Sequence, residues 1–415
     1  MDKENQANAY VFWIYSTRLH VFMYSLLLIA TPFILLRNYL VQAIAVISDT
    51  STYPFGIELK LIPLIALIIA IILLIVFRSK ITRLRILAVG LVVLLNALAQ
   101  QITDYYFDHN FYDLQQNWHY LAYGLYAYII YRDLDPRGFP LYKMLAMTYF
   151  SALGLSTFDE FFQQFMSSRV FDVCDIGKDV WGVYMGMIIV YFSSKHSATL
   201  FKDWRRIHYK KLKYYYKNPF TQMVLLFVLS VIFLTIGSLL TESEFVFLVA
   251  GLTIISFLLF FAILHLSQFK IAKYIFCSTL IALLLVQGFF FVQYRDKGIV
   301  YNQYGLTIYK GIPVPFFDIM IFPDDTFRLV DKKHYFNDRD LAFLFKRKPD
   351  IILIGSGLYG KGGKGFVDPR HAFIYNSYTK GIAQIIIQRN GEACKTFNRL
   401  KRENKNVLFI IHNTC

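Results

Sequence analysis

The chain has 415 residues, of which 56% are apolar and only 17% are charged. This composition excludes an ordinary soluble enzyme, in which charged residues make up about a quarter of the chain. The four cysteines lie far apart with no Cys-x-x-Cys pair, which excludes the familiar zinc and redox spacings.

Nine apolar stretches divide the chain up to residue 294. In lipid a backbone amide finds no hydrogen-bond partner outside its own helix, so apolar stretches of about 18 residues or more are typical of transmembrane helices. The sequence therefore predicts a polytopic α-helical membrane protein with about nine spans. The predicted spans are 19–40, 59–78, 84–103, 118–132, 143–163, 179–194, 221–240, 245–266 and 272–294.

Lysine and arginine gather in alternate connections between these spans. Short cytoplasmic loops of membrane proteins carry such an excess, so residues 78–85, 132–143 and 196–218 are predicted to be cytoplasmic. The intervening connections, at 104–113 and 242–244, carry acidic residues and fit the outer side. Nine spans would place the C-terminal residues on the outer side of the membrane, and one span more or fewer would reverse that side.

The basic loop 196–218 has aromatic residues between its charges. Next to a span, such a segment is expected to contact anionic lipid headgroups, each basic residue contributing about 1 kcal/mol. The lipid bilayer is therefore the predicted partner, and we expect no nucleic-acid partner. The residues predicted at the membrane surface are Lys202, Arg205, Arg206, Lys210, Lys211 and Lys213.

Polar side chains that lipid would not tolerate lie in three segments, each at the predicted outer end of a span. Residues three or four apart share a helix face, and carboxylates inside a membrane are costly unless they are paired. We therefore expect three helices to face one another around a polar pocket, and Gly182 and Gly186 would let a helix approach closely. The predicted pocket residues are His119, Tyr123, Asp159, Glu160, Gln163, Arg169, Asp172, Asp175 and Asp179.

Acidic groups outnumber basic groups in this predicted pocket, which predicts protonated carboxyls, a bound cation or a cationic partner. The same residues could instead form a hydrogen-bond and ion-pair network that only holds the helices together. Carboxylate oxygens also suit Mg²⁺ or Ca²⁺, but the spacing gives no defined ligand set. No metal and no cofactor is therefore predicted.

The order and spacing of these residues resemble the VanZ-like family of bacterial membrane proteins. The resemblance covers about residues 80–195, and the matching elements are HYLAYG at 119–124, DEFFQ at 159–163, Arg169, and Asp175 to Gly182. Two positions depart from the family pattern, because Gln115 replaces an acidic residue and Asp179 replaces an asparagine. The resemblance implies a role in the cell envelope, with glycopeptide (teicoplanin) resistance as the founding association, and it supplies no settled reaction.

After residue 298 the apolar runs shorten to strand length, with prolines, glycines and charges between them. Strands that alternate with helices predict a small α/β domain. The predicted strands are 305–310, 316–322, 351–355, 383–388 and 406–412, and the predicted helices are 338–347, 370–379 and 391–403. The predicted order is N-terminal spans over 1–80, a VanZ-like helical domain over 81–195, a basic cytoplasmic loop over 196–218, three further helices over 219–296 and the α/β domain over 298–415.

Residues 355–361 of this domain follow a strand and nearly form a phosphate-binding loop. Gly362 replaces the Ser or Thr that would hold Mg²⁺, so we favour a flexible glycine-rich turn. The domain resembles the small α/β family that includes the mitochondrial complex I assembly factor 3 and an adipogenesis-associated protein. The matching stretches are 318–328, 349–357, 392–400 and 407–415, and the family implies assembly or interaction roles, with a protein partner for this domain.

Three functions follow from these patterns. The first is an outward-facing pocket that binds a lipid-linked or peptide-like envelope component, or a glycopeptide. The second is an intramembrane serine hydrolase with Ser156 as nucleophile and His119 as base. The third is a membrane-anchored scaffold or assembly factor that acts through residues 298–415.

Overall fold

The computed structural model describes most of the chain, which forms two compact units. The first unit is helical and lies within the first 258 residues. The second comprises residues 259–415 with short segments near Thr103 and at Ser238–Glu242. The described residues are 15–34, 43, 46–47, 50–52, 59–76, 78–103, 114–165, 171–201, 210–332, 336, 343–344, 347–360, 362–363, 372–376 and 381–414.

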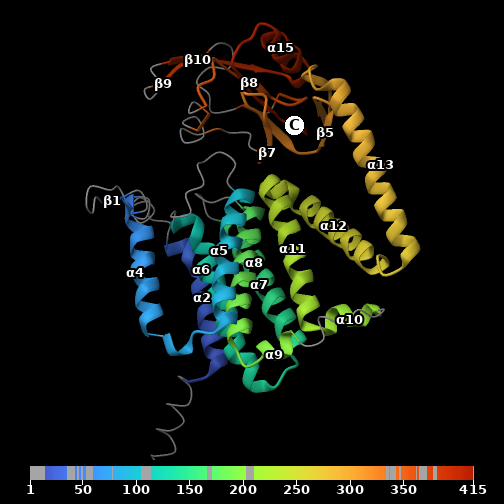
Figure 1. The fold of residues 1–415 in the computed structure, drawn as a ribbon. Coiled ribbons are helices and arrows are strands. Elements are labelled where there is room, and N and C mark those ends of the chain that lie inside the picture. Colours follow the sequence, from blue (N-terminus) through green and yellow to red (C-terminus); the bar gives the residue numbers. More distant parts are fainter. Residues whose placement is uncertain are drawn as a thin grey trace, which may run out of the picture. The chain divides into compact units, whose positions relative to one another are not determined.

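Long helices make up the first unit and begin the second (Figure 1). They are α2 (Thr17–Ile34), α4 (Leu61–Val76), α5 (Arg83–Thr103), α6 (Leu114–Leu134), α7 (Leu141–Gln163), α8 (Val173–Ser193), α11 (Pro219–Leu239), α12 (Val246–Leu266) and α13 (Lys270–Tyr294). Short elements lie between them: β1 (Ser51–Thr52), β2 (Leu59–Lys60), η2 (Arg78–Lys80), η3 (Asp135–Arg137), α9 (Ser197–Leu200), α10 (Leu212–Lys217) and η4 (Ser243–Phe245).

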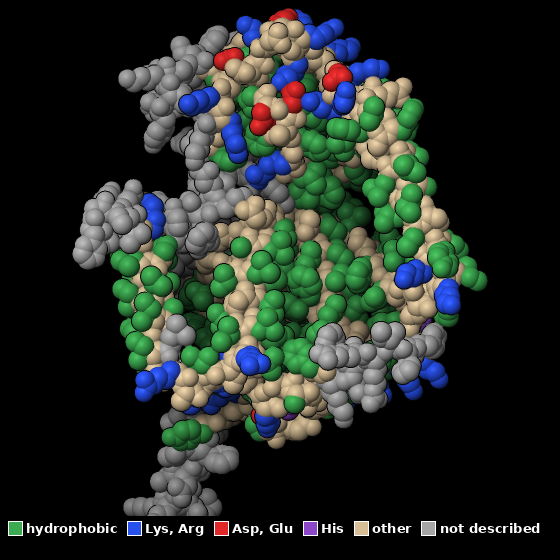
Figure 2. All heavy atoms as spheres, in the orientation of Figure 1, with side chains coloured by type: hydrophobic (Ala, Val, Ile, Leu, Met, Phe, Trp, Pro, Cys, Tyr) green, Lys and Arg blue, Asp and Glu red, His purple; other side chains and the backbone are tan. Residues whose placement is uncertain are grey.

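Within the described residues, four helical segments are long and apolar enough to cross a membrane: α5, α11, Ser243–Leu266 and α13. Hydrophobic side chains cover most of the visible surface of these helices (Figure 2). The protein is therefore mostly helical, with segments suited to a lipid bilayer. Each of the nine predicted spans overlaps a helix, but α4 has only 16 residues, and α6, α7 and α8 carry polar side chains. Length and composition thus support four crossings, and nine crossings remain a prediction.

Helices α6 and α8 approach each other along a seam of glycines. A Cβ atom added to Gly182 would lie 2.8 Å from the Cα atom of Tyr120, and one added to Gly186 would lie 2.8 Å from the Cα atom of Gly124. Only glycine leaves room for backbones this close, as small residues four apart do in membrane helices. The expected close approach is confirmed, and its partner is α6.

Hydrogen bonds between buried side chains join this pair of helices to its neighbours. The indole nitrogen of Trp181 on α8 donates to the carbonyl oxygen of Leu95 on α5 (3.1 Å). The hydroxyl of Tyr149 on α7 bonds to that of Ser230 on α11 (2.9 Å). Because the hydroxyls and the indole are buried, these bonds satisfy polar groups that would otherwise be costly. Helices α5, α7, α8 and α11 are therefore parts of one packed bundle.

The basic connections lie at one end of this bundle. Lys195 and His196, after α8, bind the Asp135 carboxylate after α6 at 3.0 and 2.6 Å, and Arg85 at the start of α5 donates to the Ser193 carbonyl (3.3 Å). Connections predicted to share one side of the membrane thus lie together. In the basic loop, Lys211 and Lys213 are exposed and the Lys210 ammonium lies 3.6 Å from the centre of the Tyr214 ring. Lys202, Arg205 and Arg206 lie outside the described residues.

The described residues that follow α13 form two sheets and the helix α15 (Asn390–Arg402). A three-stranded antiparallel sheet is formed by β3 (Ile299–Gln303), β4 (Leu306–Tyr309) and β5 (Ile312–Pro315). A six-stranded sheet has the order β7-β6-β11-β8-β10-β9, in which β11, β8 and β10 are parallel. Its elements are β6 (Asp318–Ile321), β7 (Phe327–Val330), β8 (Ile351–Gly355), β9 (Ala372–Asn376), β10 (Gly381–Gln388) and β11 (Val407–Ile411), and helix α15 packs on β8 and β11.

The sheet has a hydrophobic core on each face, because every residue of its central strands β8 and β11 is buried. On one face the Phe397 ring of α15 stacks on Phe409 with ring centres 5.0 Å apart. At the end of β11 the His412 imidazole and the backbone N–H of Asn413 both bind the buried Asp318 carboxylate, at 2.7 and 2.8 Å. His412 therefore joins β11 to β6 and has a structural role.

The predicted helix 370–379 is wrong, because Ala372–Asn376 forms β9 and pairs with β10 in antiparallel register. Phe373, Ile374 and Tyr375 are aromatic or β-branched and favour a strand once a neighbouring strand supplies the hydrogen bonds. Most of the predicted helix 338–347 lies outside the described residues.

The glycine-rich loop after β8 turns back on itself, since the Gly362 amide donates to the Ser356 carbonyl (3.0 Å). The next described element after this loop is the strand β9.

Candidate functional site

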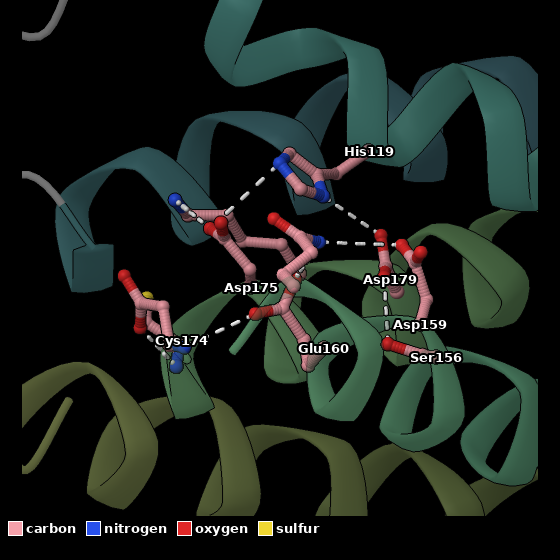
Figure 3. Close-up of polar contacts among 10 residues, drawn as sticks. His119, Ser156, Asp159, Glu160, Cys174, Asp175 and Asp179 are labelled. Atoms are coloured by element: carbon pink, nitrogen blue, oxygen red, sulfur yellow. Dashed lines mark hydrogen bonds and ion pairs between the residues drawn. The ribbon is translucent and has the colours of Figure 1, made fainter. Parts of the chain in front are cut away.

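Polar residues from the ends of three helices lie close together (Figure 3). They lie at the helix ends opposite the basic connections. Helix α6 contributes from its second turn, α7 from its last two turns, and α8 from its first two turns. We call these residues the polar cluster: His119, Ser156, Asp159, Glu160, Gln163, Asp172, Asp175, Lys178 and Asp179.

The Asp179 carboxylate on α8 lies at the centre of the polar cluster. Its Oδ2 atom accepts a hydrogen bond of 2.6 Å from the Ser156 hydroxyl on α7, and its Oδ1 atom lies 2.8 Å from Nδ1 of His119 on α6. Both distances are short, as expected where one partner is charged. One buried carboxylate thus connects all three helices.

Asp175 and His119 form the open edge of the polar cluster. The Asp175 carboxylate lies 2.9 Å from the Lys178 ammonium and 3.7 Å from Nε2 of His119. The side chains of His119 and Asp175 keep 24% and 23% of their surface exposed, whereas Asp179 keeps only 3%. A molecule that reaches the cluster therefore meets the imidazole and the Asp175 carboxylate first.

Two other carboxyl groups bind the first turn of α8. The Asp172 side chain accepts a hydrogen bond from the Cys174 amide (2.7 Å), which makes it the N-cap of the helix. Glu160 of α7 accepts one from the Asp172 amide (3.1 Å) and another from the side-chain amide of Gln163 (2.6 Å). Negative groups at this position are favoured by the helix dipole. Asp172 and Glu160 therefore have structural roles.

One buried oxygen atom beside the centre, Oδ1 of Asp159, makes no hydrogen bond with any described residue. The other Asp159 oxygen accepts only a long bond, of 3.4 Å, from Gln163. The Tyr123 hydroxyl is also buried, and it lies next to Ser156 and Asp179. Buried polar groups in native proteins nearly always have partners. The Asp159 oxygen is thus the group through which the polar cluster could bind a further molecule.

The structure therefore brings most of the predicted pocket residues together: the side chains of Asp159, Glu160, Gln163, Asp175, Asp179 and His119 contact one another in pairs. Asp172 joins them through its backbone amide, which donates to Glu160. Tyr123 is buried one turn after His119 on α6, and Arg169 lies outside the described residues. The list of predicted pocket residues does not contain Ser156, which the sequence suggests only as a nucleophile, or Lys178, which counts only among the basic groups that face the acids. Helical spacing gave a signal for both, since each lies three residues from a cluster carboxylate on its own helix.

The polar cluster is rich in acid. Among the described residues, five carboxyl groups (Asp159, Glu160, Asp172, Asp175 and Asp179) accompany one lysine and one histidine. No group of three His, Cys, Asp or Glu side chains in this part of the chain is arranged to hold a metal ion. A proton, a cation or a cationic group would balance this surplus of acid.

The hydrogen bonds of Ser156 differ from those of a nucleophile. A serine nucleophile gives its proton to a histidine, but the Ser156 hydroxyl donates to Asp179. Both ring nitrogens of His119 face carboxylates, Asp179 at 2.8 Å and Asp175 at 3.7 Å. This geometry gives no support to the serine hydrolase interpretation.

No family model matches the chain, and no curated protein matches it. Two solved structures match, one described as "MT938" and the other as the crystal structure of the conserved hypothetical protein PH1505 from Pyrococcus horikoshii OT3. Each is 23% identical to this chain, covers 28% of it and 98% of its own length, and has a TM-score of 0.23. A TM-score this low supports no statement about function.

Proposed function

We propose that the chain is a VanZ-like protein of the bacterial inner membrane, and that its polar cluster binds a lipid-linked or peptide-like component of the cell envelope. All nine helices would cross the membrane, with the cluster and the C-terminal domain on the outer side. The resemblance to VanZ-like proteins would also connect the activity with resistance to glycopeptide antibiotics. The observation that carries the proposal is the central Asp179 carboxylate, shared by Ser156 and His119 beside an exposed edge.

The incomplete hydrogen bonding of the polar cluster favours binding over a purely structural role. A network that only held three helices together would satisfy its own buried oxygens. Asp172 and Glu160 meet that description, because they cap α8. Asp159 does not, since its Oδ1 atom is buried without a hydrogen bond to a described residue.

The charge of the polar cluster indicates the chemistry of its ligand. Carboxylates inside a membrane are stabilised by cations or by several hydrogen-bond donors. A free amine, or a row of peptide N–H groups, supplies such donors, and both occur in peptide-like envelope components. The ligand would approach through His119 and Asp175 and end at the Asp159 oxygen.

Resistance to teicoplanin tests this proposal. The minimum inhibitory concentration would be measured in a susceptible bacterium that expresses the full chain, Asp175→Asn or His119→Gln. Both changes alter the exposed edge and leave the hydrogen bond between Ser156 and Asp179 in place. We expect the full chain to raise the inhibitory concentration and both variants to return it to the value without the protein.

Asp296→Asn is the matched control, because this carboxylate is exposed and lies just beyond α13. It should behave as the unmodified chain. Normal resistance from both edge variants, at equal amounts in the membrane, would remove the proposal. Deleting residues 298–415 distinguishes the proposed binding site from the scaffold alternative. A scaffold would lose its function without this domain, whereas a membrane-embedded site would still raise the inhibitory concentration.

A further inference from the structure

The outer face of the three-stranded sheet β3-β4-β5 carries no charged side chain. Residues directly opposite each other in an antiparallel sheet point to the same face. The pairing gives two rows on the outer face, Tyr301-Ile308-Pro313 and Gln303-Leu306-Pro315. Of the residues 299–317, which contain all three strands, only Lys310 is charged.

This outer face is exposed, although the opposite face packs into the core of the domain. Tyr309 and Val314 of the inner face are buried. By contrast, Tyr304 is 58% exposed and Phe316 is 51% exposed, at the end of the sheet where β3 turns into β4, and Tyr301 is 40% exposed. Aromatic side chains grouped on an exposed face of a domain are a typical sign of an interaction surface.

The tip of the β4–β5 hairpin is fixed to α13, the helix that precedes the domain. The side-chain amide of Gln287 on α13 donates to the Gly311 carbonyl (2.9 Å). The backbones touch here, because a Cβ atom added to Gly311 would lie 3.1 Å from the Cα atom of Phe291. Gly311 also has a positive φ of 79°, which an L side chain would adopt only with strain. The sheet and the helix are therefore held in one arrangement.

Helix α13 is a candidate membrane span, with exposed apolar side chains as far as Val292. Gln287 lies five residues before Val292, which is about 8 Å along a helix that rises 1.5 Å per residue. If α13 crosses a bilayer, the hairpin tip reaches the boundary between headgroups and acyl chains. Amphipathic faces that lie on a membrane enter it by a similar depth, about 5–10 Å.

We infer that the outer face of β3-β4-β5 lies on the surface of the bilayer that α13 crosses. Tyrosine and phenylalanine rings are favoured where apolar chains meet headgroups. The edge strand β5 also suits this place, because Pro313 and Pro315 have no N–H group to leave without a partner. The C-terminal domain thus contacts lipid directly, and the exposed Lys395 and Arg399 of α15 stay in water.

Spin-label accessibility in the full chain tests this inference. The chain would carry Cys277→Ser and Cys415→Ser, which leave Cys174 and Cys394, both buried. Burial also raises the pKa of the Cys394 thiol to about 12, which further slows its reaction with a label. Nitroxides would be attached through Tyr304→Cys or Phe316→Cys, and the protein reconstituted into vesicles of phosphatidylcholine and phosphatidylglycerol.

Power saturation then compares oxygen, which concentrates among acyl chains, with a water-soluble nickel chelate. Labels at positions 304 and 316 should favour oxygen several-fold, as should a label at Leu285→Cys on α13. The matched control at Lys395→Cys on α15 should favour the nickel chelate. Labels at 304 and 316 that behave like the control would overturn the inference. So would labels shielded from both reagents, because protein and not lipid would then cover the face.

Discussion

At the scale of single residues, the polar cluster depends on which carboxylates are buried. Asp179 is almost fully buried and binds two side chains from two other helices, whereas Asp175 is partly exposed and binds a lysine on its own helix. A hydrogen bond to a charged group contributes about 1.5–3 kcal/mol when buried. The Asp175 carboxylate keeps 23% of its surface exposed, so water solvates part of it, and among the described residues it binds only one group on its own helix at hydrogen-bond distance. The two aspartates therefore differ in their effect on stability, although the sequence presents them as equivalent members of one stripe.

We predict that Asp179→Ala lowers the free energy of unfolding by about 1.5–3 kcal/mol, since it leaves the Ser156 hydroxyl without its acceptor. Asp175→Asn, the matched control, keeps an oxygen that accepts a hydrogen bond from Lys178 and should cost only about 0.5–1.5 kcal/mol. Unfolding by sodium dodecyl sulfate from mild detergent micelles would measure both. Equal losses from the two variants would mean that Asp179 does not hold the helices together.

The composition of the polar cluster could be predicted from sequence because spacings of three and four fix the face of a helix. The pairings inside it could not, because they depend on the rotation and depth of each helix. Nothing in the spacing indicates that Glu160 binds the amide of Asp172, twelve residues later, or that Ser156 turns to Asp179 and not to His119. Those contacts follow from how closely the helices pack.

At the scale of elements, that packing is set by the glycines between α6 and α8. Gly186→Ala adds a Cβ atom that would lie 2.9 Å from the Cβ atom of Ala127 and closer still to Gly124. The helices would have to move apart, and such overpacking costs about 1–3 kcal/mol. We predict this loss of stability, together with a weaker bond between His119 and Asp179, since the two residues lie on the separating helices.

Gly90→Ala on α5 is the control for this prediction, because no atom lies within 4 Å of the added Cβ. It should leave stability unchanged or raise it by up to about 1 kcal/mol through helix propensity. Thermal unfolding in detergent would compare the two variants. A Gly186→Ala protein as stable as the Gly90→Ala protein would show that the seam can relax without cost.

The same scale explains which elements sequence patterns located. Strands β8 and β11 were found because their apolar runs are buried on both faces of the sheet. The prediction of a helix at β9 is wrong, because its five residues do not indicate the neighbouring strand that supplies their hydrogen bonds. A local sequence pattern does not show which other strand a segment pairs with.

At the scale of the whole molecule, the number of helices that cross the membrane decides on which side the C-terminal domain lies. Among the described residues, four candidate spans lie between Lys80 and that domain. Four is an even number, so these spans alone would put Lys80 and the domain on one side of the membrane. Helices α6, α7 and α8 have 21, 23 and 21 residues. At 1.5 Å per residue each is about 30 Å long, enough for the apolar core of a bilayer. If α6, α7 and α8 all cross as well, the number of crossings becomes odd, and Lys80 and the C-terminal domain lie on opposite sides of the membrane.

The packing of these three helices favours crossing. Helix α8 is bonded to α5 through Trp181, and α7 is bonded to α11 through Tyr149, and both partners are candidate spans. We therefore predict that a membrane-impermeant maleimide labels Glu403→Cys in intact cells and labels Lys80→Cys only after the membrane is opened. Cys277→Ser and Cys415→Ser would leave only Cys174 and Cys394 as native cysteines, and both are buried. If both sites are labelled together, an even number of helices crosses between them, and α6, α7 and α8 do not all span the membrane.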